Sequence, residues 1–460
     1  MLKQTLLGLG MMAVILRADA QDSLNVHKLF NWQDPGLPIG TSELQNKYNE
    51  VWGYAAGGRE YAFIGSTRGI HILDVTDPTA TVLVDYVQGR NSGSGVIHRD
   101  LKTHADHLYA VCDQGPSSLQ IMDLRYLPDS VHLVYDSNEF FARAHNIQVD
   151  TINARLYTCG GSNQFSVYSI ADPASPVLLA NLEMDVPWWN SLIGYVHDCH
   201  VRDNIVWTND ANAMHVVDFT DPMQPVVLGA LTSYADQGYN HSGWLNDDGT
   251  TYVMADETHG SPLKFIDVTD IGDLDVTSSV STGTSSFAVV HNPFFKGNVA
   301  HVAYYHDGYW MWDATDPTNP QVLGYYDTNP APSADNYRGA WGVYPYLPSG
   351  HVLVSDMQTG LWVLDIDQST ALNRVPNGPA YRIAPTVTTG HVNITPLSGT
   401  TTAVHIRVIT SNGQVVHTLD RTIGGQIDLD MTGLAEGLYI VSVNDGRSDH
   451  HQRILKTDHP

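Results

Sequence analysis

Apolar and polar residues alternate in short stretches that end in a turn, and this pattern recurs along residues 25–367. Clear copies are GIHILDVTDP at 69–78, MHVVDFTDP at 214–222 and YWMWDATDP at 309–317. Such alternation is typical of a half-buried strand, and Asp-Pro then ends it, because Asp bonds nearby backbone and Pro fixes φ. Seven copies of this strand predict seven copies of one all-β unit.

A second marker lies on the strand that opens each unit. A His recurs there every 44 to 52 residues, and Trp replaces it at both ends of the series. A fixed period of this size indicates a repeat architecture in which each repeat is one supersecondary unit. The markers are Trp52, His98, His145, His197, His241, His291 and Trp341.

Four strands in each unit predict a seven-bladed β-propeller, or a six-bladed one if Trp52 and Trp341 do not both begin true repeats. The last repeat has no fourth strand after residues 361–367, while the apolar segment 24–36 has no repeat of its own. We therefore expect the N-terminal strand to supply the missing outer strand and to close the ring. Closure would leave few strand edges exposed.

The two ends of the chain predict export and a second domain. Residues 1–20 have a basic start, a short apolar run and an Ala-Asp-Ala cleavage site, which is the order of a secretory signal peptide. The apolar run is shorter than the roughly 20 residues that cross a bilayer, and no later transmembrane segment is expected. We expect the propeller at 21–370, a linker at 371–383 and a small β-sandwich at 384–460.

The formal net charge is −26 at pH 7. Nucleic acid is excluded as a partner, because phosphate contacts need clustered Lys and Arg. Three cysteines in an exported chain predict one disulfide and one free thiol. Cys112 and Cys159 end the second strands of adjacent repeats, so we expect these two to pair and Cys199 to stay free. The alternative is that all three are small buried hydrophobic residues.

The side chains at the markers are candidates for ligand binding. In a propeller the innermost strand of each blade lines the channel, so equivalent positions converge at one mouth of it. Neutral imidazoles with carboxylates are ligands of Zn²⁺ and other first-row metals. Alternatively, each ring is structural and donates to the backbone of the next blade. The candidate ligands of a divalent metal ion are His145, His197, His241 and His291, and the wider ligand-binding set adds His98, Trp52 and Trp341.

Carboxylates at the same mouth are candidates for catalysis. Asp198, Asp210 and Glu257 could each act as the general base of a reaction on a metal-bound water. Two functions remain open on these residues. One is a binding protein for an extracellular glycan, peptide or surface protein, and the other is a metal-dependent extracellular hydrolase or lyase that uses the same mouth.

Two family resemblances rest on longer stretches. GREYAFIGSTRGIHILDVTDP at 58–78 and RAHNIQVDTINARLYTCGG at 143–161 resemble the choice-of-anchor B family of LVIVD-repeat proteins. That resemblance implies an extracellular β-propeller without a settled activity. Residues 429–456 are similar to the C-terminal sorting domain of the type IX secretion system of Bacteroidetes. The residues that carry this second similarity are Leu434, Gly437, Leu438, Tyr439, Arg453 and Lys456.

The second resemblance implies a destination for the chain and a partner that recognises its C-terminal domain. Such domains are read by the type IX secretion machinery after the chain has crossed the periplasm. The protein is then released or attached to surface lipopolysaccharide. We therefore expect an extracellular location or one on the outer cell surface.

Overall fold

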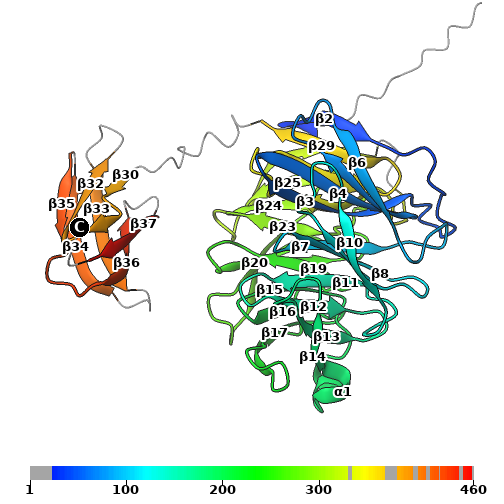
Figure 1. Cartoon of the computed structure of the whole chain (residues 1–460), viewed down its shortest axis with the longest axis horizontal. Coiled ribbons are helices and arrows are strands. Elements are labelled where there is room, and N and C mark those ends of the chain that lie inside the picture. Colours follow the sequence, from blue (N-terminus) through cyan, green and yellow to red (C-terminus); the bar gives the residue numbers. More distant parts are fainter. Residues whose placement is uncertain are drawn as a thin grey trace, which may run out of the picture. The chain divides into compact units, whose positions relative to one another are not determined.

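The computed structural model describes residues 23–329, 334–367, 381–396, 402–410, 415–423, 425–444 and 449–457. The expected signal peptide, residues 1–20, lies outside the described residues. The chain divides into two compact units, Met1–Asp367 and Gln368–Pro460. Apart from two short helices, α1 (Leu182–Asp185) and α2 (Trp189–Leu192), the described elements are strands (Figure 1). Neither helix has the length and apolarity needed to cross a bilayer.

The first unit contains antiparallel sheets that follow one another along the chain. The strands of the first four sheets are β3 (Tyr48–Ala56), β4 (Arg59–Ser66), β5 (Gly69–Asp74) and β6 (Val82–Gln88); β7 (Arg99–His104), β8 (His107–Cys112), β9 (Leu119–Asp123) and β10 (His132–Ser137); β11 (Asn146–Asp150), β12 (Arg155–Cys159), β13 (Phe165–Ser169) and β14 (Val177–Asn181); and β15 (Asp198–Arg202), β16 (Ile205–Asn209), β17 (Met214–Asp218) and β18 (Val226–Leu231).

The last three sheets of this unit include two strands from the N-terminus. They are β19 (Asn240–Leu245), β20 (Thr251–Asp256), β21 (Leu263–Asp267) and β22 (Asp275–Val280); β23 (Pro293–Lys296), β24 (Val299–Ala303), β25 (Tyr309–Asp313) and β26 (Gln321–Tyr326) with β1 (Ser23–Leu24); and β27 (Ala340–Tyr344), β28 (Val352–Asp356) and β29 (Gly360–Ile366) with β2 (Val26–Trp32).

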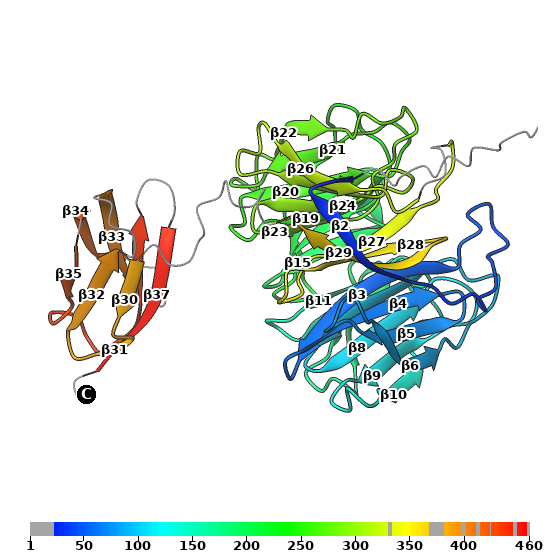
Figure 2. The ribbon, with the colours of Figure 1, turned by 90° about the horizontal axis from the view of Figure 1, so that it is seen from above.

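The innermost strands surround a common centre, which we call the hub. Each of β3, β7, β11, β15, β19, β23 and β27 lies against the next, and β27 lies against β3. At the outer side, β2 pairs antiparallel with β29, with Val26 opposite Ile366 and Trp32 opposite Leu361 (Figure 2). Residues far apart in sequence therefore share the seventh sheet.

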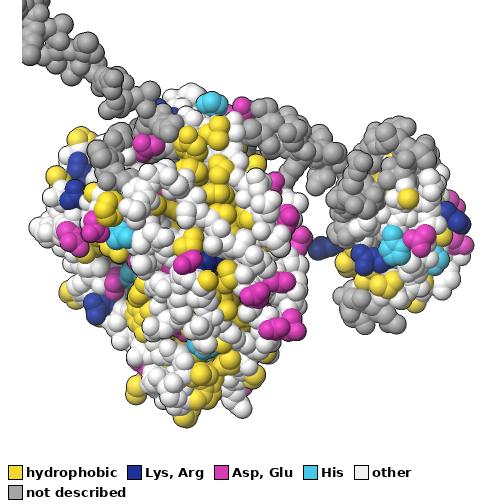
Figure 3. Space-filling view, turned by 180° about the vertical axis from the view of Figure 1, so that it is seen from behind, with side chains coloured by type: hydrophobic (Ala, Val, Ile, Leu, Met, Phe, Trp, Pro, Cys, Tyr) yellow, Lys and Arg dark blue, Asp and Glu magenta, His cyan; other side chains and the backbone are white. Residues whose placement is uncertain are grey.

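The Asp residues that end the third strands hold turns. Oδ1 of Asp74 accepts a hydrogen bond from the backbone N–H of Thr76, and Asp218 and Asp313 accept from the residue two positions on in the same way. This local bond gives the repeated Asp a structural role in the turn. On the face drawn in Figure 3, Asp and Glu side chains are spread out rather than gathered in one patch.

The expected disulfide between Cys112 and Cys159 is wrong, because all three cysteines are free. Cys159 faces the following sheet, where its Sγ lies 3.5 Å from Sγ of Cys199. Both belong to the apolar cluster between the third and fourth sheets. Sγ of Cys112 contacts the carbonyl of Gln114 at 3.6 Å instead. The end of a second strand thus packs against the next inner strand, not against the end of the preceding second strand.

The second unit has two sheets around one apolar cluster. The strands are β30 (Tyr381–Ala384), β32 (His391–Pro396) and β35 (Ile427–Asp430) in one sheet, and β31 (Val387–Thr388), β37 (Asp449–Lys456), β36 (Gly437–Asn444), β33 (Thr402–Thr410) and β34 (Val415–Ile423) in the other. Because β30 begins at Tyr381, the last three residues assigned to the linker, 381–383, are part of this unit; residues 371–380 lie outside the described residues.

Candidate functional site

Five imidazoles and one indole form a closed circle at one end of the hub, which we call the histidine ring. Each aromatic ring belongs to a different sheet. The distances between neighbouring ring centroids are 4.4 Å for His98–His145, 4.3 Å for His145–His197, 4.2 Å for His197–His241, 4.6 Å for His241–His291, 4.2 Å for His291–Trp341 and 5.3 Å for Trp341–His98. The structure therefore brings together six of the seven marker side chains.

Trp52 is the marker that the ring does not include. Its indole lies 5.0 Å from the ring of Tyr344 and 6.1 Å from that of Phe294, among side chains of the hub that lie away from the histidine ring. The register of β3 shifts between Tyr48 and Val51, which displaces Trp52 relative to the other markers. The similar spacing in sequence therefore does not give Trp52 the same place in space.

Local irregularities in the inner strands direct the ring side chains to the hub. His241 and Trp341 occupy β-bulges, where the register shifts between Asn240 and Ser242 and between Ala340 and Gly342. His145 and His197 immediately precede β11 and β15. A bulge or strand entry breaks strict alternation, so that two successive side chains can face the same way. At each of these positions, one more side chain faces the hub than strict alternation along the strand would place there.

Hydrogen bonds fix the orientation and tautomer of three imidazoles. Nδ1 of His197 lies 3.1 Å from the backbone oxygen of His241, and Nδ1 of His291 lies 2.5 Å from that of Trp341. A carbonyl oxygen only accepts, so each Nδ1 carries the proton and each Nε2 keeps a free lone pair. Nδ1 of His145 lies 2.9 Å from Oδ2 of Asp113. The expected bond to the backbone of the next repeat is present for His197 and His291, whereas His145 bonds to a side chain of the preceding sheet. In each case Nε2 stays available, as in metal-binding histidines.

Burial keeps these imidazoles neutral. It lowers the pKa of His145, His197 and His241 well below the usual range, and neighbouring imidazoles lower each of them further. Burial also lowers the pKa of His291, to about 3. A neutral imidazole is the form that binds a metal ion. The histidine ring therefore presents ligand nitrogens without first losing protons.

A second carboxylate, that of Glu257, also reaches the ring. Within the described residues, one ligand atom from each of His241, His291 and Glu257 lies within 4.8 Å of the other two. Nε2 of His241 is 3.8 Å from Oε2 of Glu257, and the Tyr305 hydroxyl donates to Oε1 of that carboxylate. Burial raises the pKa of Glu257 to about 7, although the bond from Tyr305 opposes the shift. Two imidazoles and one carboxylate are a recognised ligand set for Zn²⁺.

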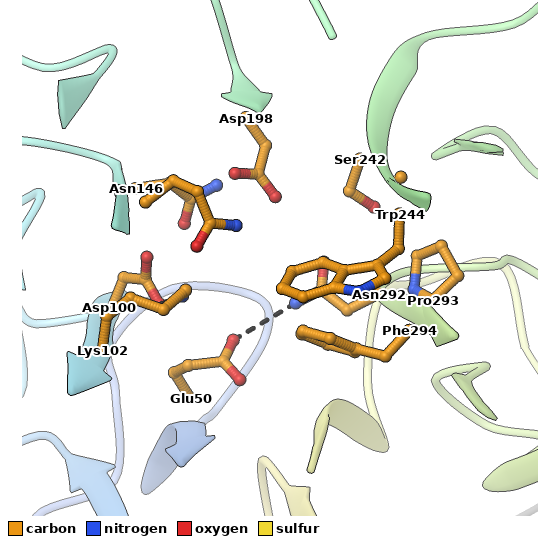
Figure 4. Close-up of a pocket in the computed structure, with 12 residues that line it drawn as sticks. Glu50, Asp100, Lys102, Asn146, Asp198, Ser242, Trp244, Asn292, Pro293 and Phe294 are labelled. Carbon is orange, nitrogen blue, oxygen red and sulfur yellow. Dashed lines mark hydrogen bonds and ion pairs between the residues drawn. The ribbon is translucent and has the colours of Figure 1, made fainter. Parts of the chain in front are cut away.

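A layer of polar side chains lies beyond the histidine ring along the inner strands (Figure 4). Nζ of Lys102 is 2.7 Å from Oδ1 of Asp100, and Nδ2 of Asn292 donates to Oε2 of Glu50 at 3.2 Å. Burial raises the pKa of Glu50 to about 8 and that of Asp198 to about 7. These side chains border a cavity of about 20 Å³, room for one water molecule.

The three catalytic candidates lie in three different settings. Glu257 belongs to the triad with His241 and His291, and Asp198 lies in the polar layer. Asp210 accepts from Nδ1 of His215 at 2.7 Å and from the backbone N–H of Ala213 at 2.6 Å, so it holds a turn. Only Glu257 thus stands beside the histidine ring with candidate metal ligands.

Sequence reasoning missed the charged side chains of the polar layer. Asp100 and Lys102 come two and four residues after His98, and both lie on β7. The alternation of side chains along a strand was therefore the signal that could have placed them on the same face as His98. Glu50 gave no such signal, because it lies within the irregular start of β3. Charged residues are rarely buried, which is why alternation alone was not enough to place Asp100 and Lys102 in the hub.

Two families match parts of the chain. The LVIVD repeat matches residues 58–88, which is consistent with the resemblance to the choice-of-anchor B family, and the "Secretion system C-terminal sorting domain" matches residues 382–457. The sorting domain marks the protein for type IX secretion to the cell surface or the extracellular space. Curated protein sequences give no match.

Among solved structures, the chain is similar to the β-propeller domain of Cps50 (Swd1) from Myceliophteria thermophila. The TM-score is 0.50 at 10% sequence identity, and the match covers 74% of this chain and 98% of that one. At so low an identity, the likeness shows a β-propeller fold and nothing of function.

Proposed function

We propose that this exported protein is a binding protein whose hub holds a divalent transition metal ion at the histidine ring. The observation that carries the proposal is the triad of His241, His291 and Glu257, whose ligand atoms lie within 4.8 Å of one another. Both imidazoles are neutral, and the Nδ1–H of His291 is already donated to a backbone oxygen. Zn²⁺ is the ion that this ligand set fits best.

His145 and His197 complete the proposed set of metal ligands. Their rings continue the circle next to His241, and each keeps Nε2 free of the bond that its Nδ1 makes. Together with His241, His291 and Glu257, these two imidazoles would offer the ion alternative ligands, or leave a position on it for a second bound molecule. His98 and Trp341 are proposed to line the same mouth without binding the metal.

The scaffold of this site is proposed to be a seven-bladed propeller closed by its N-terminal strand. Three observations support that arrangement: the seven inner strands contact one another in a cycle, the last inner strand lies against the first, and β2 pairs with β29. Because the first and last sheets both contribute to the hub, closure would hold the histidine ring at its present diameter.

A metal-dependent hydrolase or lyase is the second candidate function, and one observation favours it. A general base works best when its pKa is near the working pH, and that of Glu257 is raised to about 7. A catalytic metal site also leaves one position open for water or substrate. Of the three carboxylates predicted from sequence, Glu257 is the one that we assign as the base in this case.

The second unit is proposed to serve only export. Gly437, Leu438 and Tyr439 lie on β36, opposite Lys456, Leu455 and Ile454 of β37. Residues of the predicted sorting signal therefore lie on two neighbouring strands, β36 and β37, and we assign this pair of strands to recognition by the secretion machinery. Release or surface attachment would follow export, with residues 1–20 removed as the signal peptide.

Calorimetric titration of the protein from Gln21 onward with Zn²⁺ tests the metal site. We expect saturable binding by the unchanged chain, and an affinity at least about 100-fold lower for His291→Ala, because a ligand contributes more than the outer partners that change affinity 10–100-fold. His132→Ala is the matched control, since His132 is exposed on β10. Equal affinity of both variants and the parent would overturn the proposal.

A further inference from the structure

A second cavity lies at the other end of the hub, apart from the histidine ring. Its volume is about 500 Å³, within the range of about 300–1,000 Å³ that is usual for small-molecule sites. It is bordered by side chains of inner strands, among them Trp52, Gln148, His200 and Trp244. No residue of the histidine ring lines it. The two ends of the hub therefore present separate surfaces.

Aromatic side chains form one wall of this cavity. The ring of Trp52 lies 5.0 Å from that of Tyr344, which in turn lies 5.4 Å from that of Tyr346. Tyr346 lies 6.3 Å from Trp244. Four aromatic rings thus follow one another in contact along strands β3, β27 and β19 and the segment after β27. A flat ligand with an apolar face could stack on such a wall.

The charged groups that form the rest of the cavity wall already have partners. Lys102 is paired with Asp100, and Arg202 donates to the backbone oxygens of Leu245 and Asn246. Asp150 accepts from the side chain of Asn153 and from the backbone N–H of Asn204. An ionic ligand would have to displace these bonds. The wall therefore favours an uncharged ligand.

His200 is the exception among the polar side chains of this wall. It is 4% exposed, and neither ring nitrogen has a hydrogen-bond partner within the described residues. Burial lowers the pKa of His200 well below the usual range, so the ring is neutral and offers one donor and one acceptor. A hydroxyl group is the complement of both, because it donates and accepts. Trp244 covers the imidazole, with ring centroids 4.4 Å apart.

We propose that this cavity binds a neutral sugar. One pyranose face stacks on the rings of Trp52, Tyr344 and Tyr346, and a hydroxyl group bonds to His200 once the indole of Trp244 has turned aside. The export of the chain by its sorting domain places the cavity where extracellular glycans are met. The cavity needs no metal ion to bind a sugar. This proposal can therefore hold or fail independently of the metal site proposed at the histidine ring.

Tryptophan fluorescence and calorimetry with glucose, galactose, mannose, N-acetylglucosamine and cellobiose, each at millimolar concentration and with EDTA present, test the proposal. At least one sugar is expected to bind saturably and to change the fluorescence. Tyr344→Ala and His200→Phe should each weaken that binding at least tenfold, while Trp188→Phe, outside the cavity, should leave it unchanged.

Three results would overturn the proposal. The first is the absence of saturable binding by all five sugars. The second is binding that survives both Tyr344→Ala and His200→Phe in variants whose circular dichroism matches that of the parent. The third is binding that His145→Ala abolishes, which would assign the sugar to the histidine ring instead.

Discussion

The two ends of the hub are built by the same inner strands, yet they differ in chemistry. At one end, bulges and strand entries add an extra inward side chain, and neutral imidazoles gather in a circle in which Nδ1 of His197 and Nδ1 of His291 bond to the backbone of the next sheet. At the other end, alternation is regular, and aromatic rings pack along half of the wall. The comparison teaches that an irregular strand can turn additional polar side chains towards the hub, whereas a regular strand gives a surface on which aromatic rings pack.

The polar layer lies between the two ends of the hub and brings buried carboxyl groups close together. Glu50 is 3% exposed, and Asp100 and Asp198 lie in the same layer. Burial and the charge of Asp100 raise the pKa of Glu50, in that order, while Lys102 opposes the shift. A carboxyl group held in this way binds a proton in the folded protein that it loses in the unfolded chain. The stability of the folded protein therefore depends on whether Glu50 keeps its proton.

The largest effect is expected from removing that proton site. The pKa of Glu50 is about 8 in the folded protein and 4.5 in the reference state, so the free energy of unfolding falls as pH rises between these values. The limiting slope is about 1.4 kcal/mol per pH unit. Glu50→Gln should make the fall less steep by this amount, as measured by urea unfolding from about pH 5 to about pH 8. Glu139→Gln, an exposed control, should keep the parent's slope; an unchanged slope in Glu50→Gln would contradict the assignment.

A smaller effect is expected from filling the space beside Glu50. A Cβ atom on Gly342 would lie 2.1 Å from Oε1 of Glu50, whereas Gly95 has open space around it. Gly342→Ala should therefore lower the free energy of unfolding by about 1–3 kcal/mol, the usual cost of overpacking, and Gly95→Ala should change it little. In a Glu50→Ala background the cost should shrink, because the clashing side chain is gone. An equal cost in both backgrounds would show that Gly342 acts elsewhere.

The convergence of the five histidines could be predicted, but the details of the hub could not. A repeat period identifies equivalent strands, and equivalent inner strands meet at an axis, which is enough to bring His98 and His291 together. The period does not reveal a register shift such as the one before Trp52, because a bulge is set by local pairing. Nor does it say which neighbouring sheet a side chain faces, which is why Cys159 lies beside Cys199 and not beside Cys112.

The smallest effect concerns the pH dependence of metal binding, and it sharpens the contrast between the ends. At the histidine ring the imidazoles are neutral, with the pKa of His291 at about 3, but Glu257 has a pKa of about 7. Below about pH 7, Zn²⁺ must therefore displace one proton, and its affinity should fall about tenfold per pH unit. Glu257→Gln should bind more weakly above pH 7 and show no such slope.

Calorimetry in two buffers of different ionisation enthalpy counts the protons released. One proton per Zn²⁺ near pH 6, lost in Glu257→Gln, is the expected result, because burial leaves the imidazoles with none to release. Two or more protons would mean that ring imidazoles are charged before the metal arrives. Sugar binding at the other end should not change over this range, since the pKa of His200 lies well below it. A shared pH profile would show that the two ends are coupled through the polar layer, where Glu50 and Asp198 titrate.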